Sequence, residues 1–260
     1  MNKVLFLFCA YNEEKRLPKF FNSLRSQEVD LTIIALNDGS QDKTQEVLSN
    51  NLTSKDRLLT NKTNQGITKS FNSVVNEAQS IKSDYVTWCG VDEEIYPDAF
   101  NERIKILNRT GSDICITGSD TLLGDGRLIR YPNVLPQFAR LQGINWGDLY
   151  NELIRGNFIP SPVMTKAEIL PDLYLDLNLS HLVDWDLWIK LSRMYKFCFL
   201  DKSTQCSDWD GSNFSAPNPL NEIEKAKEML YIYDKYNVIV ENKASIRAIV
   251  DAFYGCSQIS

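Results

Sequence analysis

Three acidic groups in this sequence have the residue types and spacing to do chemistry. Asp38 follows one apolar run, Asp92 follows another, and Asp184 lies beside a tryptophan at the start of an amphipathic segment. A carboxylate at the end of a buried strand can accept two hydrogen bonds from a ribose or from a base edge. Taken alone, Asp38 is better explained as a turn residue before Gly39, so the rest of the pattern must decide its role.

Asp92, Glu93 and Glu94 place three carboxylates together after the apolar segment 85–90. Neighbouring negative charges repel one another unless a cation or hydrogen-bond donors offset them. Carboxylate oxygens suit Mg²⁺ or Mn²⁺, and Mg²⁺ typically binds one or two carboxylates together with substrate phosphates. The triplet therefore indicates a divalent-metal site. An exposed acidic loop before a helix is an equal alternative, because carboxylates stabilise helix N-termini.

Asp184 and Asp186 flank Trp185 at the start of a helix predicted over 184–196. An aromatic ring beside a carboxylate removes water from it and offers a stacking face for a sugar. The alternative is again a favourable interaction of the acids with the helix dipole. His181, the only histidine, is interpreted as a surface residue without a catalytic role.

The first hundred residues alternate strand-like and helix-like segments that would position these acids. The predicted strands are 4–9, 31–36, 57–59 and 85–90, and the predicted helices are 13–26, 41–50, 67–78 and one that starts at Pro97. This order predicts a doubly wound parallel sheet with right-handed crossovers. Ligands bind such sheets at the carboxyl ends of the strands, which here are the polar segments 10–14, 37–40 and 90–94.

The second half is less regular and predicts a mixed arrangement. Short strands are expected at 114–119, 128–131, 159–164, 197–200 and 204–207, with helices at 145–155 and 184–196 and two further helical patterns at 219–236 and 242–253. We expect one catalytic domain over 1–217, divided into halves 1–108 and 109–217. The helical extension 218–260 is expected to dock on that domain.

The composition fits an ordinary globular protein, with 43% hydrophobic residues, 24% charged residues and a net charge of −6. The acidic balance argues against nucleic acid as a partner. Six cysteines without C-x-x-C spacing argue against a structural zinc site and favour a reducing cytosol. No apolar run approaches the ~18 residues of a membrane span. A cytoplasmic protein is expected, with peripheral association at the inner face of a membrane left open.

Six motifs resemble, in order, those of family 2 glycosyltransferases of the GT-A fold. They are the opening strand and its turn, Phe8-Cys9-Ala10-Tyr11-Asn12-Glu13-Glu14; the loop Asn37-Asp38-Gly39-Ser40-Gln41-Asp42-Lys43-Thr44; Asn64-Gln65-Gly66 through Asn72; the acidic segment 92–97; Gly156-Asn157-Phe158-Ile159-Pro160-Ser161; and Asp184-Trp185-Asp186-Leu187-Trp188. Together they cover residues 4–215. Each motif is weak alone, and the ordered set is specific.

This resemblance implies a Rossmann-like, mostly parallel sheet, a smaller mixed acceptor-side half and a C-terminal helical tail. It implies an inverting transfer from a nucleotide sugar, with UDP as the expected nucleotide and Mn²⁺ or Mg²⁺ as cofactor, to a glycan or lipid-linked acceptor in polysaccharide assembly. The implied nucleotide-binding residues are Ala10, Tyr11, Asn12, Glu13, Asp38, Lys69, Val91 and Asp92. The implied metal ligands are Asp92 and Asp210, and the motif leaves open whether Glu93 or Glu94 also binds the metal. The implied general base is Asp184, and the implied acceptor-binding residues are Asn157, Trp185 and Asp186. For Lys69, an exposed helix lysine is the better supported alternative.

The sequence departs from the family pattern at three places. The acidic segment has one aspartate fewer than usual, Val183 replaces a glutamate, and the segment 208–215 lacks a histidine, whose place Asp210 could take. These departures keep a catalytically inactive nucleotide- or glycan-binding relative as an alternative. A nucleotidyltransferase is the other alternative, but the loop 10–14 has none of the glycines that its phosphate loop would need.

Overall fold

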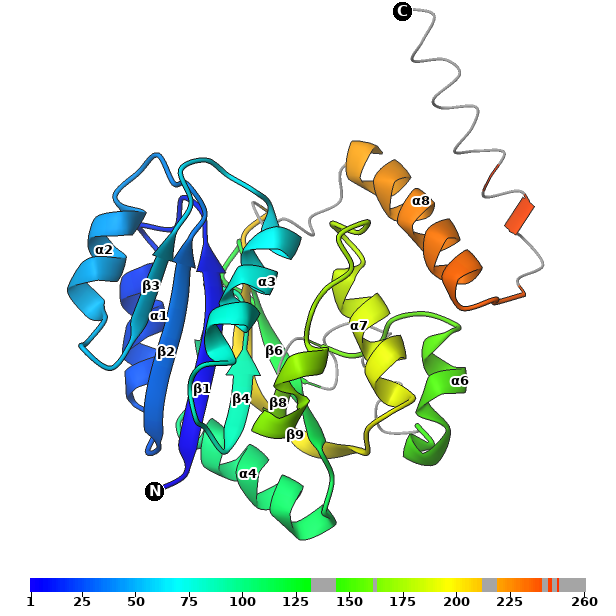
Figure 1. Cartoon of the computed structure of the whole chain (residues 1–260), viewed down its shortest axis with the longest axis horizontal. Coiled ribbons are helices and arrows are strands. Elements are labelled where there is room, and N and C mark those ends of the chain that lie inside the picture. Colours follow the sequence, from blue (N-terminus) through cyan, green and yellow to red (C-terminus); the bar gives the residue numbers. More distant parts are fainter. Residues whose placement is uncertain (132–143, 161–162, 212–218, 240–242, 245–246, 248–260) are drawn as a thin grey trace, which may run out of the picture.

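The computed structural model describes residues 1–131, 144–160, 163–211, 219–239, 243–244 and 247. Its centre is one sheet of nine strands in the order β3-β2-β1-β4-β8-β6-β9-β5, with β7 paired to β6 (Figure 1). The strands are β1 (Lys3–Ala10), β2 (Asp30–Asn37), β3 (Arg57–Thr60), β4 (Tyr85–Trp88), β5 (Glu93–Ile95), β6 (Ile114–Leu123), β7 (Leu128–Ile129), β8 (Val163–Lys166) and β9 (Phe197–Trp209).

The first four strands are parallel, as the alternating pattern predicts. The sheet becomes mixed after β4, because β8 runs antiparallel to both β4 and β6. Strand β6 is parallel to β9, and β5 closes the sheet antiparallel to β9. The carboxyl ends of the parallel strands β1, β2 and β4 therefore lie at the same end of the sheet. Strand β4 is the neighbour of β8, the first strand of the sheet order that comes from the second half of the chain.

Helices cover both faces of the sheet. The side chains of β1 alternate between two clusters, so that Phe6 contacts Phe20 of α1 (Leu17–Arg25) and Phe100 of α4 (Ala99–Thr110), while Leu5 belongs to the cluster that contains α3 (Ile67–Ala78). The first of these faces also carries α2 (Thr44–Asn51). The second also carries α6 (Leu149–Leu153), α7 (Val183–Ser192) and α8 (Pro219–Lys235).

The structure corrects several predicted elements. The acidic segment forms the short strand β5 instead of a loop, because its backbone pairs with 205–207 of β9 and buries Glu93 and Ile95. The segments predicted as strands 197–200 and 204–207 are one strand. Strand β8 begins at Val163, four residues later than expected, and the helix predicted over 145–155 is a 3₁₀ turn followed by the five residues of α6. Most of the helical pattern 242–253 lies outside the described residues.

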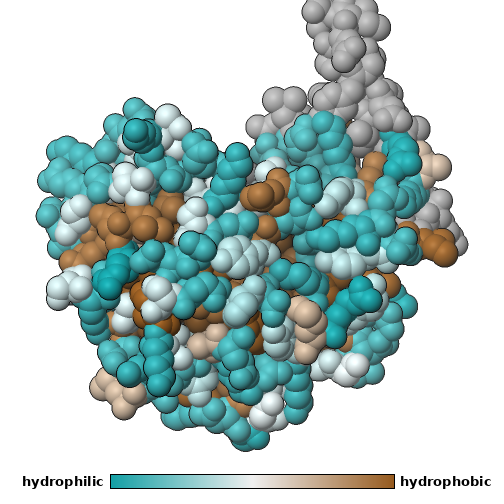
Figure 2. All heavy atoms as spheres, in the orientation of Figure 1, coloured by the Kyte–Doolittle hydropathy of each residue, from teal (hydrophilic) through white to brown (hydrophobic). Residues whose placement is uncertain are grey.

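The face in Figure 2 is mostly hydrophilic, with small hydrophobic areas between hydrophilic residues. Among the residues that the structure describes, no helix has both the length and the apolar character needed to cross a membrane.

Helix α8 docks on the loop before α7 and on α7 itself (Figure 1). Its Ile232 and Tyr233 join the core, and its Lys235 forms an ion pair with Asp176 at 2.8 Å. Burial raises the pKa of Asp176, but hydrogen bonds from Lys235, Asn178 and Tyr231 outweigh that effect and lower the pKa to about 2. The ionised form of Asp176 therefore contributes to the docking of α8.

We expect Asp176→Asn to lower the free energy of unfolding at pH 7. The folded pKa of about 2 lies below the ordinary value of 3.8, so the contribution of Asp176 is fully present above pH ~4 and is lost as the pH falls through ~2. Urea unfolding at several pH values should show the difference between wild type and variant shrinking below pH ~4. The control is Glu46→Gln, at an exposed carboxylate on α2. A difference that stays constant across the pH range would contradict this account.

Candidate active site

The loops after β1 and β2 are joined by hydrogen bonds. The Asn12 N–H donates to Ser40 Oγ at 2.9 Å, the Gln41 N–H donates to Asn12 Oδ1 at 2.8 Å, and the Glu13 N–H donates to Thr44 Oγ1 at 2.7 Å. Asn12 has a positive φ of 57°, a conformation that asparagine tolerates better than most residues. The structure thus brings the predicted nucleotide-binding loop 10–13 against the loop that contains Asp38. Tyr11 is exposed, whereas Ala10 is buried.

Asp38 is buried and organises the turn that leads into α3. Its carboxylate accepts hydrogen bonds from Asn61 Nδ2 at 2.7 Å, from the Gln65 N–H at 2.9 Å and from the Gly66 N–H at 3.0 Å. The neighbouring Gly39 has a φ of +74°, and a Cβ there would lie 2.5 Å from the Thr63 carbonyl carbon, so a side chain would clash. Asp38 therefore stabilises a turn, which is the explanation that the sequence favoured for this residue alone. Its contact with a nucleoside stays a prediction.

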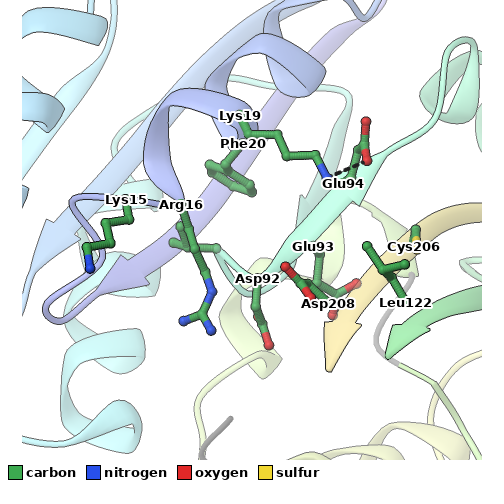
Figure 3. Close-up of a pocket in the computed structure, with 11 residues that line it drawn as sticks. Lys15, Arg16, Lys19, Phe20, Asp92, Glu93, Glu94, Leu122, Cys206 and Asp208 are labelled. Carbon is green, nitrogen blue, oxygen red and sulfur yellow. Dashed lines mark ion pairs between the residues drawn. The ribbon is translucent and has the colours of Figure 1, made fainter. Parts of the chain in front are cut away.

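A cavity of about 150 Å³ lies between the start of α1 and the acidic segment. Asp92, Glu93 and Asp208 all line this cavity (Figure 3), while Glu94 points toward Lys19. The Asp208 N–H donates to the Asp92 carbonyl at 2.8 Å, which ties the segment 92–94 to β9. The cavity is lined by Lys15, Arg16, Lys19, Phe20, Val91, Asp92, Glu93, Glu94, Leu122, Cys206 and Asp208.

Two of the implied metal ligands, Glu94 and Asp210, are paired with cations of the protein. Glu94 forms an ion pair with Lys19 at 3.0 Å, because adjacent residues of a strand point to opposite faces. Asp210 forms an ion pair with Arg16 at 2.6 Å. Within the described ranges, no three His, Cys, Asp or Glu side chains are grouped to hold a metal ion. Asp92 would fit such an ion only if substrate phosphates supplied further ligands, an arrangement common for Mg²⁺.

Arg16 is a functional candidate that the sequence analysis missed. It lies 3.2 Å from Glu13 and 2.6 Å from Asp210, and it lines the cavity beside Asp92 (Figure 3). The positive charge of Arg16 offsets the negative charges of the carboxylates beside it. Lys69, by contrast, is an exposed residue in the first turn of α3, in agreement with its structural alternative.

Asp184 lies in the first turn of α7 and is exposed to solvent. Its two carboxylate oxygens accept hydrogen bonds at 2.8 Å, one from the Trp185 N–H and the other from Asn157 Nδ2. Desolvation by the surrounding protein raises the pKa of Asp184, and these two hydrogen bonds offset part of the rise. The structure therefore brings Asn157 and Asp184 together, and their roles in acceptor binding and catalysis stay predictions.

Asp186 does not belong to this site, contrary to its predicted role in acceptor binding. It is buried, and its carboxylate binds Lys235 Nζ at 2.8 and 2.9 Å and the Tyr236 hydroxyl at 3.0 Å. Residues two positions apart on a helix face different directions, so Asp184 and Asp186 cannot serve the same site. Asp186 instead anchors the end of α8.

Trp185 is buried as well, and its indole N–H donates to the Leu153 carbonyl at 2.7 Å. Its ring packs edge to face against Tyr233 of α8, with centroids 5.9 Å apart. The predicted sugar-stacking face is therefore partly covered by protein.

A second cavity, of about 510 Å³, lies between the Asn157 loop and α8. Asn157 and Trp185, the two residues that bind Asp184, both line it. The α8 side chains that line it are spaced three and four positions apart, which is the spacing of one helix face: Glu222, Lys225, Ala226, Met229 and Tyr233. This periodicity was present in the sequence and marks one face of α8, but the sequence does not say what that face meets.

A family model described as "Glycosyl transferase family 2" matches residues 6–157, more than half of the chain. The chain belongs to this family of glycosyl transferases. It is similar to the chondroitin synthase of Pasteurella multocida (strain Pm70), with 28% identity over 212 residues that make up 80% of this chain and 21% of the synthase. The chain thus spans about a fifth of the length of that relative.

Several solved structures share the fold. S. aureus TarS 1-349 in complex with UDP-GlcNAc has a TM-score of 0.65 at 16% identity, over 97% of this chain and 71% of the TarS 1-349 chain. The mannosyltransferase PcManGT from Pyrobaculum calidifontis, in complex with GDP-Man and Mn²⁺, has a TM-score of 0.61 at 13% identity, over 96% of this chain and 69% of that one. These similarities confirm the predicted GT-A fold class.

The hydrogen bond from Asn157 to Asp184 leads to a prediction about the pKa of Asp184. In wild type, a carbon NMR titration of the Asp184 carboxyl should give a pKa above the ordinary value of 3.8. Asn157→Ala removes a hydrogen bond to the ionised form, so the pKa should rise further. Asn151→Ala, at an exposed α6 amide that binds Asp148, is the control. A pKa that falls or stays constant in Asn157→Ala would show that this hydrogen bond does not stabilise the carboxylate.

Proposed function

We propose that this chain transfers a sugar from a nucleotide sugar, with UDP as the nucleotide, to a hydroxyl of a glycan or lipid-linked acceptor, and that the transfer inverts the anomeric carbon. The observation that carries the proposal is the setting of Asp184. Asp184 lies at an exposed position in the first turn of α7, and its carboxylate is held by Asn157 Nδ2 and the Trp185 N–H. A general base must lie within hydrogen-bond reach of the proton that it removes.

In the proposed step, an Asp184 carboxylate oxygen removes the proton from the acceptor hydroxyl. The acceptor oxygen then forms a bond to the anomeric carbon from the face opposite the nucleotide, and the bond from that carbon to the diphosphate oxygen breaks. The nucleoside diphosphate leaves with the electron pair. Asn157 orients the base, since it binds one carboxylate oxygen and leaves the other lone pairs available. Catalysis of this kind depends mainly on positioning.

The cavity between the Asn157 loop and α8 is the proposed acceptor site. Asn157 and Trp185 connect it directly to Asp184. The similarity to a chondroitin synthase supports a growing glycan chain as acceptor. We place the reaction in the cytoplasm, at the inner face of the membrane when the acceptor is lipid-linked.

The donor site is proposed at the joined loops after β1 and β2, with Asp92 at the diphosphate. The UDP-GlcNAc complex of TarS supports a UDP-sugar, and the GDP-Man and Mn²⁺ complex of PcManGT supports a divalent cation. A bound Mn²⁺ or Mg²⁺ would offset the charge that develops on the leaving diphosphate. Asp92 would hold it, and Arg16 lies beside the same cavity as a fixed positive charge.

Asp184→Asn should reduce the transfer rate by about 10²–10⁴-fold, because the amide keeps the size of the side chain but cannot take a proton. UDP affinity, measured by calorimetry, should stay unchanged. The assay measures UDP release from a panel of UDP-sugars with chondroitin oligosaccharides as acceptors. Asp148→Asn, an exposed carboxylate beside α6, is the matched control. A wild-type rate in Asp184→Asn would exclude this base, and wild-type protein that binds UDP without turnover would indicate an inactive relative.

Mn²⁺ should tighten UDP binding by wild type, and a chelator should reverse the effect. Asp92→Asn should lose this dependence, since the amide no longer provides an anionic ligand. Glu94→Gln should keep it, because Glu94 is paired with Lys19 and points away from Asp92. Calorimetry with and without Mn²⁺ measures each protein. The same affinity in chelator and in Mn²⁺ for wild type would leave Asp92 without a role in metal binding.

A further inference from the structure

Helix α7 begins without a side-chain cap of its own. Its N-cap residue is Leu182, which has no polar side chain and makes no capping hydrogen bond. The first backbone N–H groups of a helix lack partners within the helix, and a capping side chain normally accepts from some of them. The loop 180–182 and the first turn of α7 carry Asp184, so whatever holds this loop also sets the place of that carboxylate.

Glu228 of α8 holds the loop. Its carboxylate accepts hydrogen bonds from the backbone N–H groups of Ser180 at 2.8 Å, His181 at 2.9 Å and Leu182 at 2.8 Å, and from Ser180 Oγ at 2.8 Å. Glu228 is buried, with 7% of its surface exposed. Hydrogen bonds to an ionised acceptor are roughly twice as strong as neutral ones, and a negative charge at a helix N-terminus is favourable.

The titration of Glu228 agrees with this geometry. Burial raises its pKa, but the hydrogen bonds from Leu182, Ser180 and His181 outweigh burial and bring the pKa below its ordinary value. The carboxylate is therefore ionised under neutral conditions and acts as an acceptor only.

Helix α8 also binds α7 on the C-terminal side of Asp184. Lys235, near the end of α8, binds the Asp186 carboxylate at 2.8 Å. The residues two before and two after Asp184 are thus both attached to α8. The region matched by the family model ends at residue 157, so neither α7 nor α8 belongs to the matched segment.

We propose that Glu228 is a positioning residue for Asp184: it fixes the loop 180–182 and thereby places the base against the acceptor. The inference rests on the proposed role of Asp184. A displacement of about 1 Å in a reacting group can cost about 10²-fold in rate, so a looser loop should slow transfer without weakening the donor site.

Glu228→Gln in the full chain tests the inference. The amide would present an N–H₂ donor to backbone N–H groups, so the loop should lose part of its support. We expect kcat to fall about 10- to 100-fold, with the KM for the UDP-sugar and the Kd for UDP unchanged. Hydrogen exchange at the amides of 180–182 should be faster than in wild type. Unchanged exchange and an unchanged kcat in the folded variant would overturn the proposal.

Tyr231→Phe is the matched control for general loosening of α8. It removes the hydroxyl that donates to Asp176 at 2.8 Å and accepts from Asn178 at 3.1 Å, two residues that precede the loop 180–182. This variant should be less stable to urea but should keep kcat and slow exchange at 180–182. An equal loss of kcat in Tyr231→Phe and Glu228→Gln would mean that α8 acts only through stability, which contradicts a positioning role.

Two further variants separate the outcomes. Asp184→Asn is measured beside them: if it is slow while Glu228→Gln keeps the wild-type kcat, the base stands and the positioning inference fails; if Asp184→Asn keeps the wild-type rate, the proposed function itself fails. Should Glu228→Gln not fold, Glu228→Asp keeps the charge but is shorter by one methylene. Its kcat should fall several-fold with the UDP-sugar KM unchanged, and a wild-type kcat would overturn the inference.

Discussion

Negative charge gathered at one edge of the sheet is the constraint on which the rest of the structure depends. The chain carries a net charge of −6, and several carboxylates lie beside one another where strands end. Several of them are held by donors or cations from another segment: Asp38 by the loop 61–66, Asp210 by Arg16, and Glu94 by Lys19. The pairings that relieve charge repulsion also set the distances between the loops of the site.

Local patterns in the sequence predict the first half of the fold well. Strands β1, β2 and β4 are apolar runs buried on both faces, and such runs stand out between amphipathic helices. Strand β5 has no such signal, because three residues with two glutamates resemble a loop. Its partner, 205–207 of β9, lies more than a hundred positions later, and only the folded chain brings the two together.

In the candidate site too, local sequence patterns predict some features, while others depend on partners that are distant in the sequence. Residue types and motif order identified Asp184 with Asn157, because both lie in recognisable segments. The sequence left open whether Glu93 or Glu94 accompanies Asp92, because the partner of Glu94, Lys19, lies in α1 and is distant in sequence. The error at Asp186 could have been avoided, since residues two apart on a helix do not face the same way. Glu228 could not be found in advance, because nothing near it in the sequence indicates which N–H groups it meets.

The two sides of the proposed site are held by different kinds of contact. The donor loops are joined to each other by short hydrogen bonds such as that from Asn12 to Ser40, between strand ends that are neighbours in the sheet. The base and the acceptor cavity depend instead on α8, from the other end of the chain. Helix α8 both lines that cavity and binds the loop before Asp184. On the proposed function, substitutions at the cavity-lining positions of α8 would alter acceptor binding while Glu228 keeps the proposed base in place.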